Sequence, residues 1–211
     1  MKITEIYKKY KITQSLQEHQ LRVAAVAKQI CDNLTVPVDA KTVIEACLLH
    51  DMGNIIKFEL GSNPKWLEPE GLEYWKVVQK EFTNKYGEDE HHATLQIAKE
   101  LKVSHDVFSC IDNIGFSKAV RNLEQGTIEQ KICGYSDMRV GPDRVLSLEG
   151  RLEDGNARWP HRPHFVIDFG ERIRAWHAIE SQIFENVKIQ PSNITDECIA
   201  LIIEELRAYE I

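Results

Sequence analysis

The stretch Glu45-Ala46-Cys47-Leu48-Leu49-His50-Asp51-Met52-Gly53-Asn54 carries an apolar helical pattern that ends in an adjacent histidine and aspartate. Apolar residues three and four positions apart mark one face of the helix, and His50 and Asp51 continue that face, so both side chains should point into the core. Gly53 is typical of a helix end. Burying an imidazole and a carboxylate is unfavourable unless a partner compensates for the lost water. A divalent cation would compensate both groups; the alternative is an Asp51 that caps the turn or hydrogen-bonds the histidine.

The same helical spacing recurs along nearly the whole chain, and no segment shows the alternating pattern of a strand. We therefore predict an all-α fold. Glycines and prolines in residues 150–165 predict an irregular basic loop, whose His161 and His164 should be solvated rather than metal-bound. The predicted helices cover residues 15–33 (with Ser15 as N-cap), 40–51, 71–86, 91–101, 104–114, 168–185 and 195–209, with another beginning near residue 127.

The composition excludes some classes of function. A formal charge of −7 argues against a protein that follows a nucleic-acid backbone or binds an anionic membrane, because both need a basic face. It is compatible with a small phosphorylated substrate held by a metal and a few local cations. The five scattered cysteines form no Cys-x-x-Cys pair and predict reduced core thiols in the cytoplasm. We expect neither a signal peptide nor a membrane span.

Two further side chains could join the His-Asp pair in the core. His19 lies on the apolar face of helix 15–33, and Asp137 follows the buried position of Cys133 by four residues. Taken alone, His19 could be a core histidine bound to the backbone, and Asp137 could pair with a surface arginine. Together, imidazoles and carboxylates suit Mn²⁺, Fe²⁺, Ni²⁺, Mg²⁺ or Zn²⁺, while the lack of thiol ligands argues against a structural zinc site.

Three segments in this order carry a family resemblance: Glu18-His19-Gln20-Leu21-Arg22-Val23-Ala24, Leu48-Leu49-His50-Asp51-Met52-Gly53 and Tyr135-Ser136-Asp137. The set resembles the HD-domain superfamily of metal-dependent phosphohydrolases. The resemblance implies an HD-domain helical bundle, here with extra C-terminal helices. It also implies that one divalent metal ion is bound by His19, His50, Asp51 and Asp137.

On this basis we expect residues 1–211 to form a single domain. Residues 15–150 would be the HD core, with an insertion at about 61–90, and residues 151–211 would be a loop and C-terminal helices that pack on that core. The aromatic stripe of the insertion is typical of core packing. The insertion could also supply a side chain that stacks on a nucleotide base, from among Trp66, Tyr74 and Trp75.

Some members of the superfamily hold a second metal ion with two further histidines. His92 resembles the first of these, although its neighbour His91 could be the one that faces the site. Where the second histidine is expected, the chain has Asn113 or Asp112. This favours a single metal ion and leaves His92 to contact the phosphate or the leaving group.

The function implied is hydrolysis of a phosphate ester, mono- or diester, of a small, nucleotide-like substrate by metal-activated water. Asp51 would bind the metal and could accept the proton of that water. Arg22, Lys57 and Arg139 are candidate phosphate-binding cations, with solvated surface cations as the alternative. Asn54, where many members have lysine, is a further candidate substrate contact. The alternative function is a non-catalytic HD-fold module for ligand sensing or partner binding; a homo-oligomer is compatible with either.

Overall fold

The structure is a computed structural model that describes residues 1–62, 64–158 and 169–211. Within these residues the chain forms eleven α-helices and no β-sheet, so the predicted all-α fold is confirmed. Among the described helices, none is long and apolar enough to cross a membrane. The helices are α1 (Ile3–Lys9), α2 (Gln14–Asp32), α3 (Ala40–Leu49), α4 (Leu72–Tyr86), α5 (Glu90–Glu100), α6 (His105–Asp112), α7 (Ala119–Gln125), α8 (Ile128–Asp137), α9 (Leu148–Arg158), α10 (Phe169–Phe184) and α11 (Asp196–Leu206).

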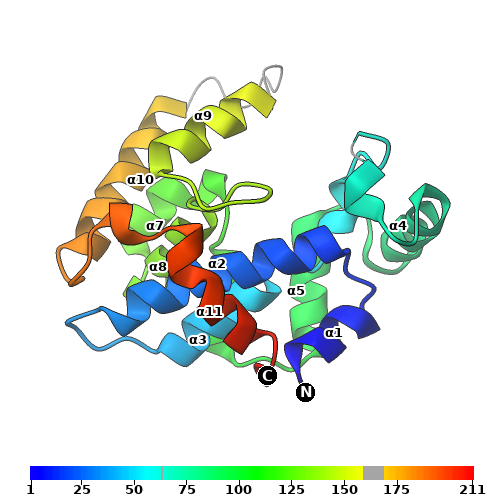
Figure 1. Ribbon diagram of the computed structural model, residues 1–211, viewed down its shortest axis with the longest axis horizontal. Helices are drawn as coiled ribbons and strands as arrows, with labels where there is room; N and C mark the ends of the chain where they lie inside the picture. The colour runs from blue at the N-terminus through cyan, green and yellow to red at the C-terminus, as the bar shows by residue number, and fades with distance from the viewer. Residues whose placement is uncertain (63, 159–168) are drawn as a thin grey trace.

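Helix α2 runs through the middle of the molecule (Figure 1) and packs against α3, α8 and α11. It begins because the Thr13 hydroxyl, and not that of Ser15, accepts a hydrogen bond from the Leu16 backbone N–H at 3.3 Å. Its apolar face lies in the core as the sequence pattern predicts. The buried side chains of this face include Leu16, Val23, Val26 and Ile30.

The turn after α3 is held tightly against α5. Asp39 caps the start of α3, and the helix gives way at His50 to a turn and the short 3-10 helix η1 (Asn54–Lys57). In this turn the Gly53 backbone N–H donates to the Thr94 hydroxyl at 2.9 Å. A Cβ on Gly53 would lie only 2.3 Å from the carbonyl oxygen of Glu90, so the close approach of α5 requires a glycine here.

The C-terminal helices pack on the same core. Helix α10 lies against α7 and α8 and buries Trp176 completely, and α11 lies across α2 (Figure 1). The two ends of the chain meet: the Met1 amino group donates to the Ile211 carbonyl at 2.8 Å, and Ile211 N–H returns a bond to Met1.

Helices α7 and α9 lie in segments that the sequence analysis interpreted differently. Residues 148–158, placed partly in an irregular loop, form α9, because the prolines that argued against a helix lie beyond its end. Helix α7 lies between the predicted helix 104–114 and the one that begins near residue 127, where no helix was predicted. His161 and His164 lie outside the described residues.

The segment that was predicted to be an insertion contains the 3-10 helix η2 (Pro64–Leu67) and α4. Trp75 is buried and its indole N–H donates to the Leu67 carbonyl at 3.0 Å, so this side chain fastens η2 to α4. The Gln79 amide holds η1 by donating to the carbonyls of residues 55, 56 and 58. Trp75 is therefore a core residue and is withdrawn as a candidate for stacking on a base.

Replacing Gly53 with alanine tests the packing of this turn. We expect Gly53→Ala to lower the free energy of unfolding by about 1–3 kcal/mol, because the added methyl group overlaps the α5 backbone. Gly61→Ala is the control, since among the described residues no atom lies within 4 Å of its added Cβ. Urea unfolding measures both variants, and equal stabilities would contradict the packing described.

Candidate metal centre

Four side chains from distant parts of the chain converge beside the centre of α2. His19 comes from α2, His50 and Asp51 from the end of α3, and Asp137 from the last position of α8. His19 Nε2 lies 3.3 Å from Asp137 Oδ1 and 3.7 Å from Asp51 Oδ2, and His50 Nε2 lies 3.6 Å from each of the same two oxygens. The ligand-type atoms of His19, His50 and Asp51 all lie within 4.8 Å of one another. The structure thus brings together the four side chains that the motifs singled out.

His50 is held in an orientation that suits a metal ligand. Its Nδ1 lies 2.8 Å from the carbonyl oxygen of Cys47. A carbonyl can only accept a hydrogen bond, so Nδ1 carries a proton and, in the neutral ring, Nε2 has a free lone pair. Within the described residues, this Nε2 is fully buried without a hydrogen-bond partner. A buried nitrogen left in this state needs a ligand, and it faces the two carboxylates.

The electrostatics of the cluster favour positive charge. Burial lowers the pKa of His50, but the carboxylates of Asp51 and Asp137 outweigh it and raise this pKa to about 9. Burial likewise raises the pKa of Asp137, yet the neighbouring imidazoles of His19 and His50 hold this pKa well below its ordinary range. The Asp137 carboxylate therefore remains ionised, and the cluster attracts either protons or a cation.

The spacing of the donor atoms fits a divalent cation. Two ligand atoms about 2.1 Å from one ion and at right angles to each other are about 3 Å apart. The observed separations of 3.3–3.7 Å are only slightly longer. Two imidazoles with two carboxylates are also a donor set that suits the divalent ions named from the sequence. The residues present therefore fit one divalent ion.

Comparison with protein families agrees with this geometry. Residues 16–113 match the family model described as HD domain. The chain carries an HD domain. The match supports the resemblance to the HD-domain superfamily of metal-dependent phosphohydrolases that the motifs indicated; it covers a little under half of the chain and ends before Asp137. No curated protein and no solved structure gives a significant match.

A buried glutamine of the HD domain contributes to the centre and was missed in the sequence analysis. Gln20 is completely buried on α2, and its Oε1 accepts a hydrogen bond from the Asp51 backbone N–H at 3.2 Å. It therefore ties the turn that carries Asp51 to the helix that carries His19. An amide side chain on the apolar face of α2 was the signal that could have identified it.

The structure favours His91 over His92 as the half-buried histidine of α5. His91 Nε2 and Asp112 Oδ1 are 3.0 Å apart, a direct hydrogen bond in which the two groups satisfy each other. His92 is exposed and its ring lies 3.3 Å from Gln96 on the same helix. The catalytic role of His92 is not tested by these contacts and stays a prediction. Asn113 is buried, and its amide donates to the Ser109 carbonyl.

Arg139 was predicted to bind phosphate, and the structure contradicts this. The side chain is buried, and its guanidinium donates to the Tyr135 hydroxyl and to the carbonyls of Leu146, Pro191 and Ile194. With its donors used by backbone and tyrosine oxygens, Arg139 joins α8 to the segment before α11 and is unsuited to binding a substrate.

The other predicted substrate contacts are placed differently. Arg22 lies one turn beyond His19, and its Nε donates to Asp196 at 3.1 Å; within the described part of the chain, its buried Nη1 has no hydrogen-bond partner. Lys57 is partly exposed, with its Nζ 3.4 Å from Glu90. Asn54 is buried at the start of η1. Of the three predicted cations, Arg22 is therefore the one that has a buried N–H donor, Nη1, without an acceptor within the described residues.

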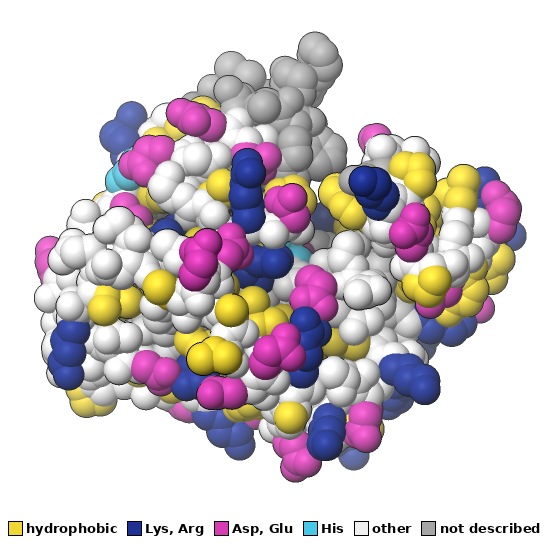
Figure 2. All heavy atoms as spheres, in the orientation of Figure 1, with side chains coloured by type: hydrophobic (Ala, Val, Ile, Leu, Met, Phe, Trp, Pro, Cys, Tyr) yellow, Lys and Arg dark blue, Asp and Glu magenta, His cyan; other side chains and the backbone are white. Residues whose placement is uncertain are grey.

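A cavity of about 580 Å³ opens one helical turn before His19, between the start of α2 and η2. The surface is indented between the α4 side and the α9–α11 side, and a histidine side chain is visible on the floor of this indentation (Figure 2). Trp66 borders the cavity with an exposed fraction of 37%, whereas Tyr74 does not line it. The residues that line the cavity are Gln14, Ser15, Glu18, Lys65, Trp66, Glu68 and Pro69.

A substitution at Arg139 tests its structural role. Arg139→Met should lower the free energy of unfolding by about 3–5 kcal/mol, because it leaves buried carbonyl and hydroxyl groups without their donor. The exposed Arg144 serves as the control, and Arg144→Met should change stability by less than about 0.5 kcal/mol. Thermal and urea unfolding measure the difference; an Arg139→Met protein as stable as the parent would refute this role.

Proposed function

We propose that this HD-domain protein hydrolyses a phosphate ester of a small, nucleotide-like substrate and uses a single divalent metal ion. The observation that carries the proposal is the buried Nε2 of His50, which has no hydrogen-bond partner within the described residues and faces a second imidazole and two carboxylates from three helices. The ion is one of Mn²⁺, Fe²⁺, Ni²⁺, Mg²⁺ or Zn²⁺, and the ester is a phosphomonoester or a phosphodiester.

The residues of the chain have separate roles in this proposal. His19, His50, Asp51 and Asp137 hold the ion, which when bound makes water more acidic and stabilises negative charge on a phosphoryl group. Asp51 presents Oδ2 to the two imidazoles, and its second oxygen accepts the proton of the attacking water. Arg22 Nη1 binds a phosphoryl oxygen, since a buried guanidinium nitrogen is most stable with an anionic acceptor.

The cavity beside α2 supports a substrate that carries an aromatic ring. Its volume of about 580 Å³ lies in the usual range for small-molecule sites, and it begins one turn from His19. Trp66 offers a partly exposed indole on which a base can stack. Lys57 and Asn54, which follow the metal-binding turn, complete the set of proposed substrate contacts.

We also place the protein in the cytoplasm. All five cysteines are free thiols, and four of them are buried. Disulfide-free cysteines of this kind are typical of a reducing compartment.

Removing a metal ligand tests the proposed function. His50→Gln and Asp51→Ala should each lower bound Mn²⁺ and phosphate-ester turnover by at least about 100-fold, because each removes a direct ligand of the ion. Helicity measured by circular dichroism should be kept. His105→Gln is the control, since this histidine is exposed and, in the described part of the chain, pairs only with its neighbour Asp106.

The assay combines metal analysis of the purified full chain with a panel of phosphomonoesters and phosphodiesters. Undiminished turnover in Asp51→Ala would refute the assigned roles. Metal binding without hydrolysis of any ester would instead support the alternative of a non-catalytic ligand-sensing module.

Trp66 tests the substrate class. Trp66→Ala should raise the KM for a nucleoside monophosphate about 5- to 100-fold, because stacking of a base contributes about 1–3 kcal/mol. The KM for ribose 5-phosphate, which has no base, should stay unchanged. Tyr74→Ala is the matched control, as Tyr74 is exposed on the same segment but lies outside the cavity lining. An equal loss with both substrates would contradict stacking on Trp66.

A further inference from the structure

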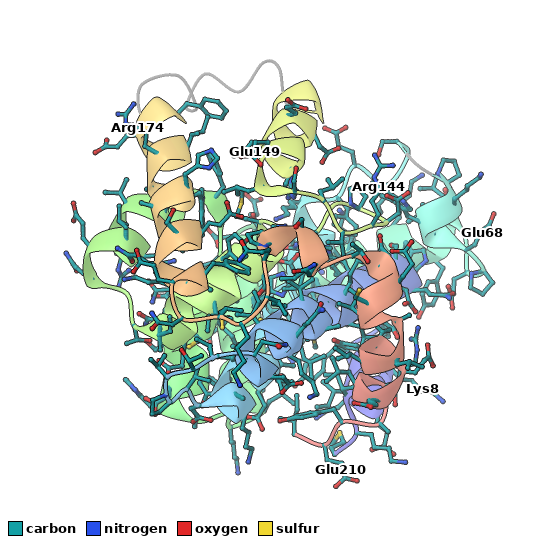
Figure 3. All side chains as sticks on the ribbon, turned by 60° about the vertical axis from the view of Figure 1, so that its left-hand side comes forward. Lys8, Glu68, Arg144, Glu149, Arg174 and Glu210 are labelled. Carbon is teal, nitrogen blue, oxygen red and sulfur yellow. The ribbon has the colours of Figure 1, made fainter. Side chains whose placement is uncertain are left out.

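Helix α11 and the residue that follows it form ion pairs with α2 at two positions, one before and one after His19 in the sequence. At its start, Asp196 Oδ1 accepts a hydrogen bond from Arg22 Nε at 3.1 Å. Just after its end, Arg207 donates two hydrogen bonds of 2.9 Å to the two carboxylate oxygens of Glu18. Glu18 and Arg22 are four residues apart, so they lie one turn apart on the same face of α2. Figures 1 and 3 both show α11 crossing α2.

The two ion pairs have opposite polarity, which specifies a single alignment of the helices. The acid lies on α11 in one pair and on α2 in the other. A one-residue rotation of α2 would turn it by about 100° and break both pairs. Partly exposed ion pairs contribute little to overall stability, but the two-pronged Arg207–Glu18 contact has a defined geometry. The main consequence of the pairs is therefore the orientation of His19, which lies between Glu18 and Arg22.

Asp196 also connects α2 to the segment that follows Asp137. Its Oδ2 accepts a hydrogen bond from the Val145 backbone N–H at 3.0 Å, while its Oδ1 holds Arg22. One carboxylate thus links the helix that carries His19 to the loop that continues from the α8 ligand. Because Arg22 Nε donates to Asp196, the guanidinium is held in one orientation. Within the described residues, its buried Nη1 has no acceptor and can bind another group.

We propose that α11, which lies outside the HD-domain match, is part of the metal and phosphate site, with Asp196 and Arg207 as positioning residues. Asp196 aims Arg22 at the phosphoryl group, and Arg207 fixes the rotation of α2 that places His19 beside His50 and Asp137. This inference rests on the proposed function and names two further residues that the same site needs.

Asp196→Asn tests the first role in the Mn²⁺-loaded full chain, with inorganic phosphate as the probe in titration calorimetry. Phosphate affinity should fall about 5- to 10-fold, whereas Mn²⁺ affinity should change by less than about twofold, because the variant frees Arg22 and leaves the metal ligands in place. Glu197→Gln is the matched control, since it removes the neighbouring first-turn charge of α11 and is expected to match the parent. Equal phosphate affinities in the two variants would overturn the role of Asp196.

Arg207→Glu tests the second role through Mn²⁺ affinity. The variant should bind Mn²⁺ about 3- to 10-fold more weakly, and the reciprocal double variant Glu18→Arg/Arg207→Glu should recover to within about twofold of the parent, because it restores an ion pair between the same positions. Glu204→Gln is the control, as it removes the pair that Arg207 forms within its own helix. A double variant no better than Arg207→Glu, or a single variant with parental affinity, would overturn this role.

The outcomes separate this inference from the proposed function. Normal binding of Mn²⁺ and phosphate with no hydrolysis would contradict the proposed function alone. A parent protein that binds Mn²⁺ but not phosphate would contradict the role of Asp196, and one that binds no Mn²⁺ would contradict both proposals.

Discussion

The burial of His50 against two carboxylates is the constraint on which the rest of the centre depends. The Cys47 carbonyl accepts a hydrogen bond from Nδ1 of the ring, and Nε2 is buried beside Asp51 and Asp137. Such a group of charges in the interior is stable only if positive charge is supplied to it. A divalent ion would supply this charge, and it would also activate the water that the proposed hydrolysis of a phosphate ester uses.

The surrounding helices bring the four proposed ligands close together and keep them there. Gly53 lets α5 lie directly on the turn that carries Asp51, and Gln20 ties the same turn to α2. Asp196 and Arg207 then fix α2 from its other side. The HD domain is thus supported by a helix that lies outside the family match, and the ligands belong to parts of the chain that are more than a hundred residues apart.

Much of the fold, and the convergence of the four candidate ligands, could be predicted because both leave local patterns in the sequence. The helical period of the apolar residues indicated the helices, and inward-facing His19, His50, Asp51 and Asp137 followed from the same period. Arg139 could not be assigned in this way. Two of its partners are carbonyls some fifty residues away, and backbone carbonyls carry no sequence signal. Which histidine of α5 faces inward could not be predicted either. The position of the Asp89 cap sets the rotation of the helix, so that His91, and not His92, hydrogen-bonds Asp112.

The most direct test is the position of the ion itself. Crystals of the full chain grown with Mn²⁺ can be measured by anomalous scattering at a wavelength where manganese contributes strongly. We expect one strong peak bounded by His19 Nε2, His50 Nε2 and carboxylate oxygens of Asp51 and Asp137. A cluster without a peak in crystals soaked at saturating Mn²⁺, or a peak bound by other residues, would contradict the assignment of this centre.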